Sequence, residues 1–283
     1  LLEYPIEIEN LKNLILELVE KRKKELTTLK QRDLLIEGCK NLNEVVKVPE
    51  YFFGSNLSNL LNDSQVRFNL LKNDIIFIWG EKGLGKEKLA EFIHMSSSEK
   101  EKGFKAVNTK SIPESYEEEY FFDQKKGIFE DKSLGTICLL NICVNNKNSH
   151  LIINKALEIK SKLSNLIIIF NEKNKAFIEE NLEENLRCLF LKSNIHVLPL
   201  KNRRVDLKLL LKYYLIKFQN SHKNNFSVSE NVLESLQSYD WPGNLVELEN
   251  LIEEVCATFD KKELKLDDLP QKFNKELNPY KGI

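Results

Sequence analysis

The sequence has no apolar run long enough to cross a lipid bilayer, and its 283 residues carry a formal net charge of only −1 at pH 7. The first absence argues against a membrane protein. The second removes the broad basic surface that a nucleic-acid-binding chain usually carries. Cysteine is also scarce, and the five residues lack CxxC spacing, which favours reduced thiols in a cytoplasmic protein over a metal site (Cys39, Cys138, Cys143, Cys188 and Cys256).

What remains is the composition of a globular chain, with 42% hydrophobic and 30% charged residues. A chain of this length can bury a sizeable core and a smaller second unit. It begins with Leu1 instead of methionine and shows no secretory signal, so we expect a fragment or a processed form.

Residues 6–30 have the pattern of one amphipathic helix, because their leucine and isoleucine residues fall near a single stripe (Leu11, Ile15, Leu18, Leu26 and Leu29). Such a helix could lie on its own domain. It could also be a coiled-coil linker that joins two copies of the chain, and the charged remainder of the segment favours this second interpretation.

From Tyr51 onward, apolar runs alternate with helical patterns, which predicts a parallel sheet covered by helices on both faces. Strands are expected at 75–79, 104–110, 135–142, 165–171 and 195–200, and helices at 86–96 and 156–163. After Asp206 we expect no further strand. Three helical segments, 206–222, 229–239 and 244–259, predict a small all-helical second domain.

Residues 80–86 read G-E-K-G-L-G-K between a predicted strand and a predicted helix, as a phosphate-binding loop requires. Glycines let backbone N–H groups turn inward, the helix N-terminus adds its dipole, and Lys86 can reach the β- and γ-phosphates. A glycine-rich turn with a chance lysine is the alternative. Glu87 stands where a hydroxyl would normally help to hold Mg²⁺. The expected nucleotide-binding residues are Gly80, Glu81, Lys82, Gly83, Leu84, Gly85, Lys86 and Glu87.

The stretch "GEKGLGKEKLAEFIH" resembles "GESGTGKELVARAIH" of bacterial sigma-54-dependent transcription activators, a branch of the AAA+ ATPases in which this glutamate is usual. Further segments match in the family's order: "FKAVNTKSIPES" is similar to "FVAVNCAALPES", and "SYDWPGNLVELENLIEEV" to "YPWPGNVRELENVIERA". The resemblance extends from about Tyr51 to Pro270.

The resemblance implies a P-loop AAA+ α/β fold, a parallel sheet flanked by helices, with a C-terminal helical lid and an N-terminal linker helix. The expected boundaries are 1–48 for the linker, which would include the end of a receiver domain, 49–207 for the nucleotide-binding domain, 208–275 for the lid and 276–283 for a tail. Asn171 corresponds to the family's sensor asparagine and joins the expected nucleotide-binding residues.

The chain departs from the family at its catalytic positions. Leu140 and Asn141 replace the aspartate that holds magnesium-bound water and the glutamate that positions the attacking water. The sigma-contacting loop "GAFTGA" is "GIFEDK" at 127–132. Glu183 and Leu189 replace the family's arginines that act in trans, and Val246 replaces the arginine of the lid. We therefore expect no catalytic residues and no metal site.

The sequence thus predicts an ATP- or ADP-binding regulatory module of a sigma-54-activator-like response regulator, with or without Mg²⁺, that does not hydrolyse ATP efficiently. One alternative is an active ATPase that remodels the sigma factor of RNA polymerase, with carboxylates among Asp123, Glu130 and Asp131 as substitutes. Another is an interaction scaffold without nucleotide. The expected partners are a second copy, RNA polymerase or another regulator. DNA binding is not expected, because nothing after Pro270 has the length or basic character of a helix-turn-helix.

Overall fold

The computed structural model describes residues 75–95, 97–159, 165–222 and 224–273, all within one compact unit, Pro49–Ile283. The predicted linker helix at 6–30, with its dimerisation stripe, and the predicted tail at 276–283 lie outside the described residues.

The described part of the chain contains a five-stranded sheet in the order β2-β3-β4-β1-β5, with every neighbouring pair parallel. Two of its three inner strands, β4 and β1, are buried along their whole length, as their continuous apolar runs predict. The strands are β1 Ile75–Trp79, β2 Gly103–Asn108, β3 Leu134–Ile142, β4 Asn165–Phe170 and β5 Asn194–His196.

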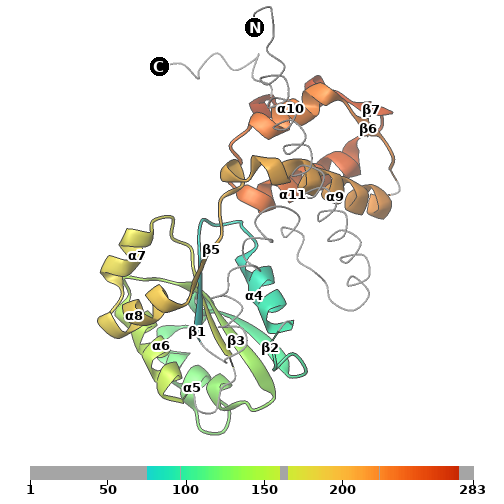
Figure 1. The fold of residues 1–283 in the computed structure, drawn as a ribbon. Coiled ribbons are helices and arrows are strands. Elements are labelled where there is room, and N and C mark those ends of the chain that lie inside the picture. Colours follow the sequence, from blue (N-terminus) through green and yellow to red (C-terminus); the bar gives the residue numbers. More distant parts are fainter. Residues whose placement is uncertain (1–74, 96, 160–164, 223, 274–283) are drawn as a thin grey trace, which may run out of the picture. The chain divides into compact units, whose positions relative to one another are not determined.

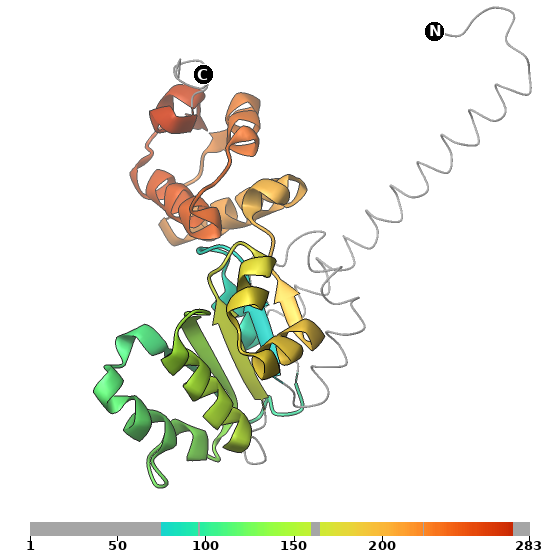
Figure 2. The same ribbon diagram turned by 90° about the vertical axis from the view of Figure 1, so that its left-hand side faces the viewer.

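Helices cover both faces of this sheet, which confirms the predicted architecture (Figure 1). Helix α4 (Lys86–Met95) lies on one face, and the other four lie on the opposite face, which Figure 2 shows from a second direction (α5 Glu114–Phe122, α6 Lys147–Ile159, α7 Lys175–Asn181 and α8 Glu184–Lys192). Phe77 of β1 packs edge-on against Phe190 of α8, with ring centroids 5.7 Å apart. The core on this face therefore joins the centre of the sheet to its helices.

The helix predicted at 156–163 is wrong at its start, because α6 begins at Lys147. Its first turns bury Ile152 and Ile153, but asparagine and serine interrupt the apolar pattern there. Helix α5 was not predicted at all. Phe121 is the one residue that α5 buries, so the segment shows no amphipathic period.

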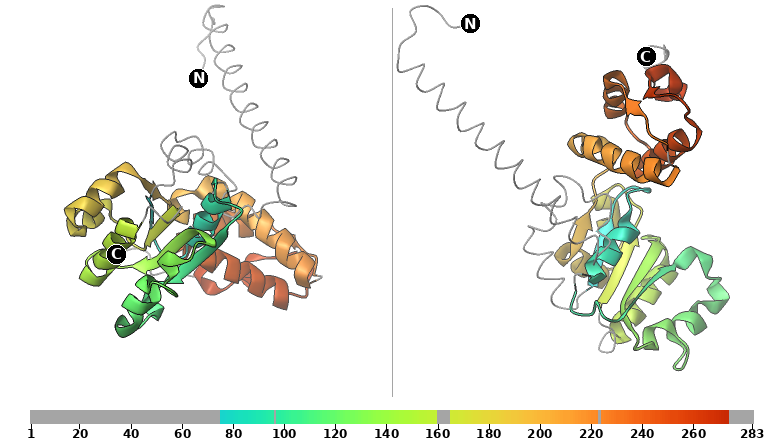
Figure 3. Two further views of the ribbon diagram at one scale, coloured as in Figure 1. Left: turned by 90° about the horizontal axis from the view of Figure 1, so that it is seen from below. Right: turned by 90° about the vertical axis from the view of Figure 1, so that its right-hand side faces the viewer.

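The C-terminal part forms the helical lid, in which α9 packs along α11 and also contacts α10 (Figure 3; α9 Arg204–His222, α10 Glu230–Ser238, α11 Asn244–Thr258). Trp241, with 1% of its surface exposed, lies in the core of the lid and donates from Nε1 to the carbonyl oxygen of Leu236 at 2.9 Å.

The expectation of no strand after Asp206 is wrong. The residues before α10 pair in parallel with those after α11, as β6 (Ser227–Val228) and β7 (Glu263–Leu264). Ser227 N donates to Lys262 O at 2.9 Å and Ser229 N to Leu264 O at 3.1 Å. Strands of two residues are too short to produce an alternating pattern in the sequence.

Short 3₁₀ helices complete the described elements: η2 Thr109–Ser111, η3 Ile128–Glu130, η5 Leu200–Asn202, η6 Leu266–Asp268 and η7 Gln271–Phe273. Among the described residues, no helix combines the length and the apolar character that crossing a membrane requires.

Candidate functional site

The loop between β1 and α4 has the backbone geometry of a phosphate cradle. Gly80, Gly83 and Gly85 have φ values of 142°, 76° and 71°, which residues with a Cβ rarely adopt. At Gly80 a Cβ would also lie 2.5 Å from the carbonyl oxygen of Val197. The turn that the glycine spacing predicts is therefore present, and it leads directly into the N-terminus of α4.

Lys86, with 4% of its surface exposed, lies at the centre of this loop. Its Nζ donates to the carbonyl oxygens of Gly80 at 3.0 Å and Glu81 at 2.5 Å. Burial lowers the pKa of Lys86 from 10.5 to about 8, although the nearby charge of Glu81 opposes that change. A buried ammonium among backbone carbonyls, inside a glycine turn and at a helix N-terminus, fits an anionic group such as a phosphate.

Trp79 fixes the start of the loop to the edge strand of the sheet. Its indole ring stacks on the imidazole of His196 in β5, with centroids 3.7 Å apart and planes 7° apart. The indole Nε1 donates to Asn194 Oδ1 at 2.9 Å. Burial lowers the pKa of His196, which favours the neutral ring in this stack.

Three asparagines form a hydrogen-bonded chain at the carboxyl ends of β2, β3 and β4. Asn171 Nδ2 donates to Asn141 Oδ1 at 2.7 Å, and Asn141 Nδ2 donates to Asn108 Oδ1 at 2.9 Å. Asn141 has a φ of 58°, a left-handed conformation that asparagine tolerates better than most residues. The structure thus brings Asn141 and Asn171 together and adds Asn108, which the sequence analysis did not single out.

The residues around Leu140 do not fit a magnesium site. The side chain of Leu140 offers no oxygen ligand, and Mg²⁺ prefers carboxylates, substrate phosphates and water. Among the residues that the structure describes, no group of three or more histidine, cysteine, aspartate and glutamate side chains is placed to hold a metal.

Residues 127–129 of the loop at 127–132 are buried against the core. Phe129, with 1% of its surface exposed, stacks on Phe121 and Phe122 with ring centroids 5.6 Å and 5.4 Å apart. Ile128 is buried beside it. A loop in this conformation does not present its phenylalanine to a partner.

Two of the three carboxylates that could substitute for the missing pair, Asp123 and Asp131, are occupied in local turns. Asp123 Oδ1 accepts from the backbone N–H groups of Lys125 at 2.9 Å and Lys126 at 2.7 Å, and these bonds lower the pKa of Asp123. Asp131 Oδ1 accepts from the hydroxyl and the N–H of Ser133, which lowers the pKa of Asp131 in the same way. Both carboxylates therefore stabilise the connection between α5 and β3.

The residues at the family's two trans-acting arginine positions, Glu183 and Leu189, make contacts within this chain. Glu183 accepts a hydrogen bond of 2.9 Å from Asn154 of α6 and lies 3.5 Å from the imidazole of His150. Leu189 packs against the hydrophobic core. Neither side chain has the charge that stabilises a transferred phosphoryl group in a neighbouring subunit.

Asn244, at the start of α11, is the second site residue that the sequence analysis missed. Its Nδ2 donates to Glu81 Oε2 at 3.1 Å and to Lys82 O at 3.0 Å, and its Oδ1 accepts from Leu200 N at 2.8 Å. Asn244 ends the segment "WPGN", which enters the family match above only as part of a longer motif. Its match to the family motif was the signal that could have identified Asn244.

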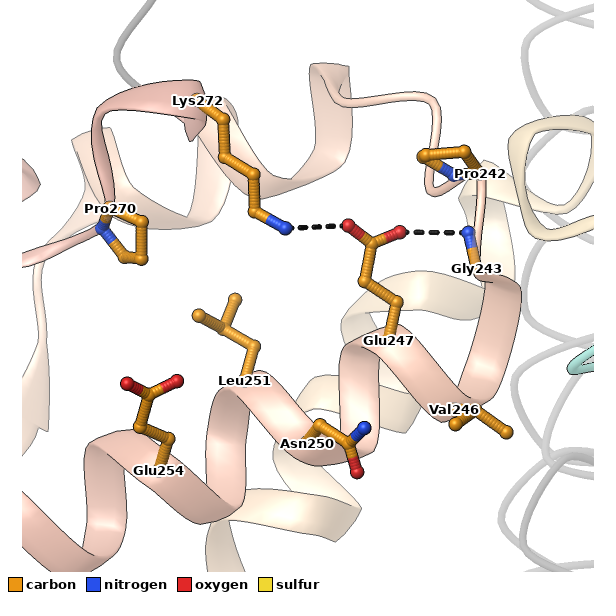
Figure 4. Close-up of a pocket in the computed structure, with 9 residues that line it drawn as sticks. All are labelled: Pro242, Gly243, Val246, Glu247, Asn250, Leu251, Glu254, Pro270 and Lys272. Atoms are coloured by element: carbon orange, nitrogen blue, oxygen red, sulfur yellow. Dashed lines mark hydrogen bonds and ion pairs between the residues drawn. The ribbon is translucent and has the colours of Figure 1, made fainter.

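Val246, at the position of the family's lid arginine, is 52% exposed and lines a pocket of about 500 Å³ in the lid (Figure 4). Glu247 forms one wall, where it accepts from Gly243 N at 2.9 Å and pairs with Lys272 at 2.7 Å. Burial alone would raise the pKa of Glu247, but these bonds outweigh burial and lower it. The remaining lining residues are Pro242, Asn250, Leu251, Glu254 and Pro270.

Comparisons with known proteins agree with this geometry. Residues 58–158 match the sigma-54 interaction domain, and residues 201–281 match the AAA+ ATPase lid domain. An uncharacterized protein from the HyuA 5′ region of Pseudomonas sp. (strain NS671) is 30% identical over 237 residues, which are 73% of this chain and 78% of that protein.

Named regulators are similar over about as much of the chain. LuxO of Vibrio parahaemolyticus is 28% identical over 228 residues (72% of this chain and 50% of LuxO). The phenol regulator MopR of Acinetobacter guillouiae is 29% identical over 219 residues (69% of this chain and 39% of MopR). The chain thus spans half or less of these two regulators.

A solved structure shares the fold. NtrX from Brucella abortus, crystallised in complex with ATP, matches with a TM-score of 0.66 at 21% identity, over 97% of this chain and 62% of NtrX. Fold, sequence motifs and relatives agree: the chain belongs to the sigma-54 interaction domain family of AAA+ proteins.

Proposed function

We propose that the chain is a regulatory AAA+ module that binds ATP or ADP through residues 80–87 and Asn171 and does not hydrolyse ATP efficiently. One observation carries the proposal: an intact phosphate cradle around Lys86 lies at the same carboxyl edge of the sheet as a neutral pair, Leu140 and Asn141, at the positions of the family's carboxylates. The crystallisation of NtrX with ATP and with ADP supports nucleotide binding in a protein of this fold.

In this proposal the N–H groups of residues 82–87 and the ammonium of Lys86 hold the phosphates, and the dipole of α4 adds a favourable field. A bound nucleotide supplies the triphosphate charge that these donors neutralise. Lys86 then exchanges its bonds to Gly80 O and Glu81 O for bonds to phosphate oxygens. Charge-assisted hydrogen bonds of this kind are stronger than bonds to neutral carbonyls.

Hydrolysis lacks its proton acceptor. The carboxamide of Asn141 cannot take a proton from water, and both of its polar atoms are engaged by Asn108 and Asn171. Glu183 and Leu189 cannot stabilise transferred charge in a second subunit, and an arginine in that role is worth about 10³–10⁵ in rate.

The module takes part in transcription regulation, which the similarity to LuxO and MopR supports. Because Phe129 is buried, contact with the sigma factor through residues 127–132 is not supported. RNA polymerase or another regulator would then bind a different surface. A transcription regulator acts on the chromosome, so we place the protein in the cytoplasm.

Calorimetric titration with ATP, with and without Mg²⁺, combined with a phosphate-release assay, tests the proposal. We expect binding that depends weakly on Mg²⁺, and phosphate release at background. Lys86→Ala should weaken binding by about 1.5–3 kcal/mol, the range of a charge-assisted hydrogen bond. Lys88→Ala, an exposed lysine on the same helix, is the matched control and should leave binding unchanged.

Turnover near 1 s⁻¹, about the lower end for kinases, would show that other carboxylates replace the missing pair. Absence of binding under both conditions would leave an interaction scaffold that does not use nucleotide.

A further inference from the structure

Asn244 connects three segments that are far apart in the sequence. It is fully buried, and its side chain bonds the phosphate loop at Glu81 and Lys82 and the connection between β5 and α9 at Leu200. Its φ of 53° is uncommon outside glycine but accessible to asparagine. A left-handed buried residue with both polar atoms of its side chain bonded is held in one conformation by its surroundings.

The backbone of the lid contacts the same loop. The second and third N–H groups of α11, those of Leu245 and Val246, donate to the carbonyl oxygen of Gly83 at 3.0 Å and 3.3 Å. These groups have no partner within their own helix, so Gly83 supplies the acceptor that caps the helix. A Cβ on Gly83 would overlap the carbonyl oxygen of Gly243, so the two backbones approach as closely as glycine allows.

We propose that the lid detects the state of the phosphate loop through Asn244 and Glu81, in place of the arginine whose position Val246 occupies. This inference rests on the proposed function, namely that the loop binds a nucleotide. The N–H and C=O of a peptide unit point in opposite directions. N–H groups that turn inward to a phosphate therefore leave carbonyls on the outside of the loop, where Lys82 O and Gly83 O meet the lid.

Glu81 contacts both the phosphate-binding lysine and the lid. Its carbonyl oxygen accepts from Lys86, and its carboxylate accepts from Asn244 and lies 3.7 Å from the ammonium of Lys173, two residues after Asn171. When Lys86 turns to a phosphate, Glu81 loses one of these bonds, and polarisation of the loop amides strengthens the carbonyls facing the lid. Binding in the loop thus changes the strength of the bonds that hold α11.

The sharpest variant is Asn244→Asp. It keeps the oxygen that accepts from Leu200 N and tolerates the left-handed backbone, but it removes both hydrogen bonds to the loop and places a second carboxylate beside Glu81. The matched control is Asn250→Asp, the same chemical change at an exposed position of the same helix. A second variant, Glu81→Ala, removes the acceptor from the loop side and leaves the lid intact.

Hydrogen exchange by mass spectrometry on the full chain, with and without saturating ATP, separates loop from lid. In the unmodified chain and in Asn250→Asp, ATP should protect both residues 80–86 and the first turns of α11. In Asn244→Asp, the loop should still be protected and the first turns of α11 should not. ATP affinity should fall at least about fivefold, the lower end for coupled sites. Glu81→Ala should change the same quantities in the same direction.

A double variant, Glu81→Gln with Asn244→Asp, reverses the polarity of the pair, because the new amide can donate to the new carboxylate. It should recover part of the protection of α11. ATP-dependent protection of α11 that is equal in the unmodified chain, Asn244→Asp and Glu81→Ala would overturn the inference while leaving nucleotide binding in place. Absence of protection at residues 80–86 in the unmodified chain would overturn the proposed function, and this inference with it.

Discussion

Asn171, at the end of β4, donates from Nδ2 to Asn141 Oδ1 at 2.7 Å. Asn141 occupies the position of the family's water-positioning glutamate, so this hydrogen bond from the neighbouring strand fixes its side chain. Asn141 Nδ2 in turn donates to Asn108 Oδ1. Each link needs a donor on one side and an acceptor on the other, and carboxamides have both. The three side chains therefore form a neutral network at the carboxyl edge of the sheet.

Restoring the carboxylates by Leu140→Asp with Asn141→Glu should leave phosphate release within about tenfold of background. The reason is that Glu183, Leu189 and Val246 still supply no arginine, and an arginine finger is worth about 10³–10⁵ in rate. A phosphate-release assay at saturating ATP measures this. A carboxylate at position 141 also cannot donate to Asn108, which should cost about 1 kcal/mol of stability. The Lys86→Ala variant defines the background rate, and recovery of most of the family's activity would show that the carboxylates were the one missing component.

The pKa of Lys86 predicts a pH-dependent free energy of unfolding in the absence of nucleotide. The folded pKa is about 8 and the ordinary value is 10.5, so between these pH values the unfolded chain binds more protons than the folded chain. Stability conferred by this group should therefore rise from pH 8 to about 10, by roughly 3 kcal/mol at most. Urea unfolding of the unmodified chain and of Lys86→Met at several pH values gives the difference between their free energies of unfolding. The titrations of all other groups are common to both proteins and cancel in this difference. Parallel curves for the two proteins would contradict the assignment of a buried ammonium.

Phe129→Ala should destabilise the protein by about 3–5 kcal/mol, as for other buried aromatic residues, because the ring fills the core beside Phe121 and Phe122. Lys132→Ala, at an exposed position of the same loop, should change stability by no more than about 0.5 kcal/mol. Chemical unfolding of both variants makes the comparison. Equal stability of Phe129→Ala and the unmodified chain would mean that the ring is exposed and available to a partner.

The stripe of Leu11, Ile15 and Leu18 predicts a dimer through the segment 6–30, with burial contributing roughly 25 cal/mol per Å² before the entropy of association. Light scattering on the intact chain and on Leu11→Glu with Leu18→Glu should give a dimer and a monomer, respectively. Lys12→Glu, a change to the charged remainder of the segment, is the control and should leave the dimer intact. A monomeric intact chain at micromolar concentration would rule out the coiled-coil interpretation.

The sequence predicts the inner strands well because β1, β3 and β4, which are buried on both faces, are near-continuous apolar runs. All five expected strands are present, and β1 has the expected limits of 75 and 79. It predicts α5 poorly, because a helix with one buried residue has no period to detect. The pair β6 and β7 is held by backbone bonds between distant segments, which no local pattern encodes.

The site divides in the same way. The glycines and Lys86 are contiguous, so a motif identifies them. The chain from Asn108 through Asn141 to Asn171 depends on β3 lying between β2 and β4, which is a property of strand order. Asn244 is still further from the loop in sequence, and its role follows only from the contact between α11 and the phosphate loop.

The stack of Trp79 on His196 has a spectroscopic consequence. The chain has two tryptophans, one directly before the phosphate loop and one, Trp241, three residues before Asn244. Emission of Trp79 should respond to any ligand or proton that changes the ring of His196 or the turn at Gly80, while Trp241 is enclosed in the lid. The native fluorescence of the protein therefore combines a signal from each end of its nucleotide site, without an added dye.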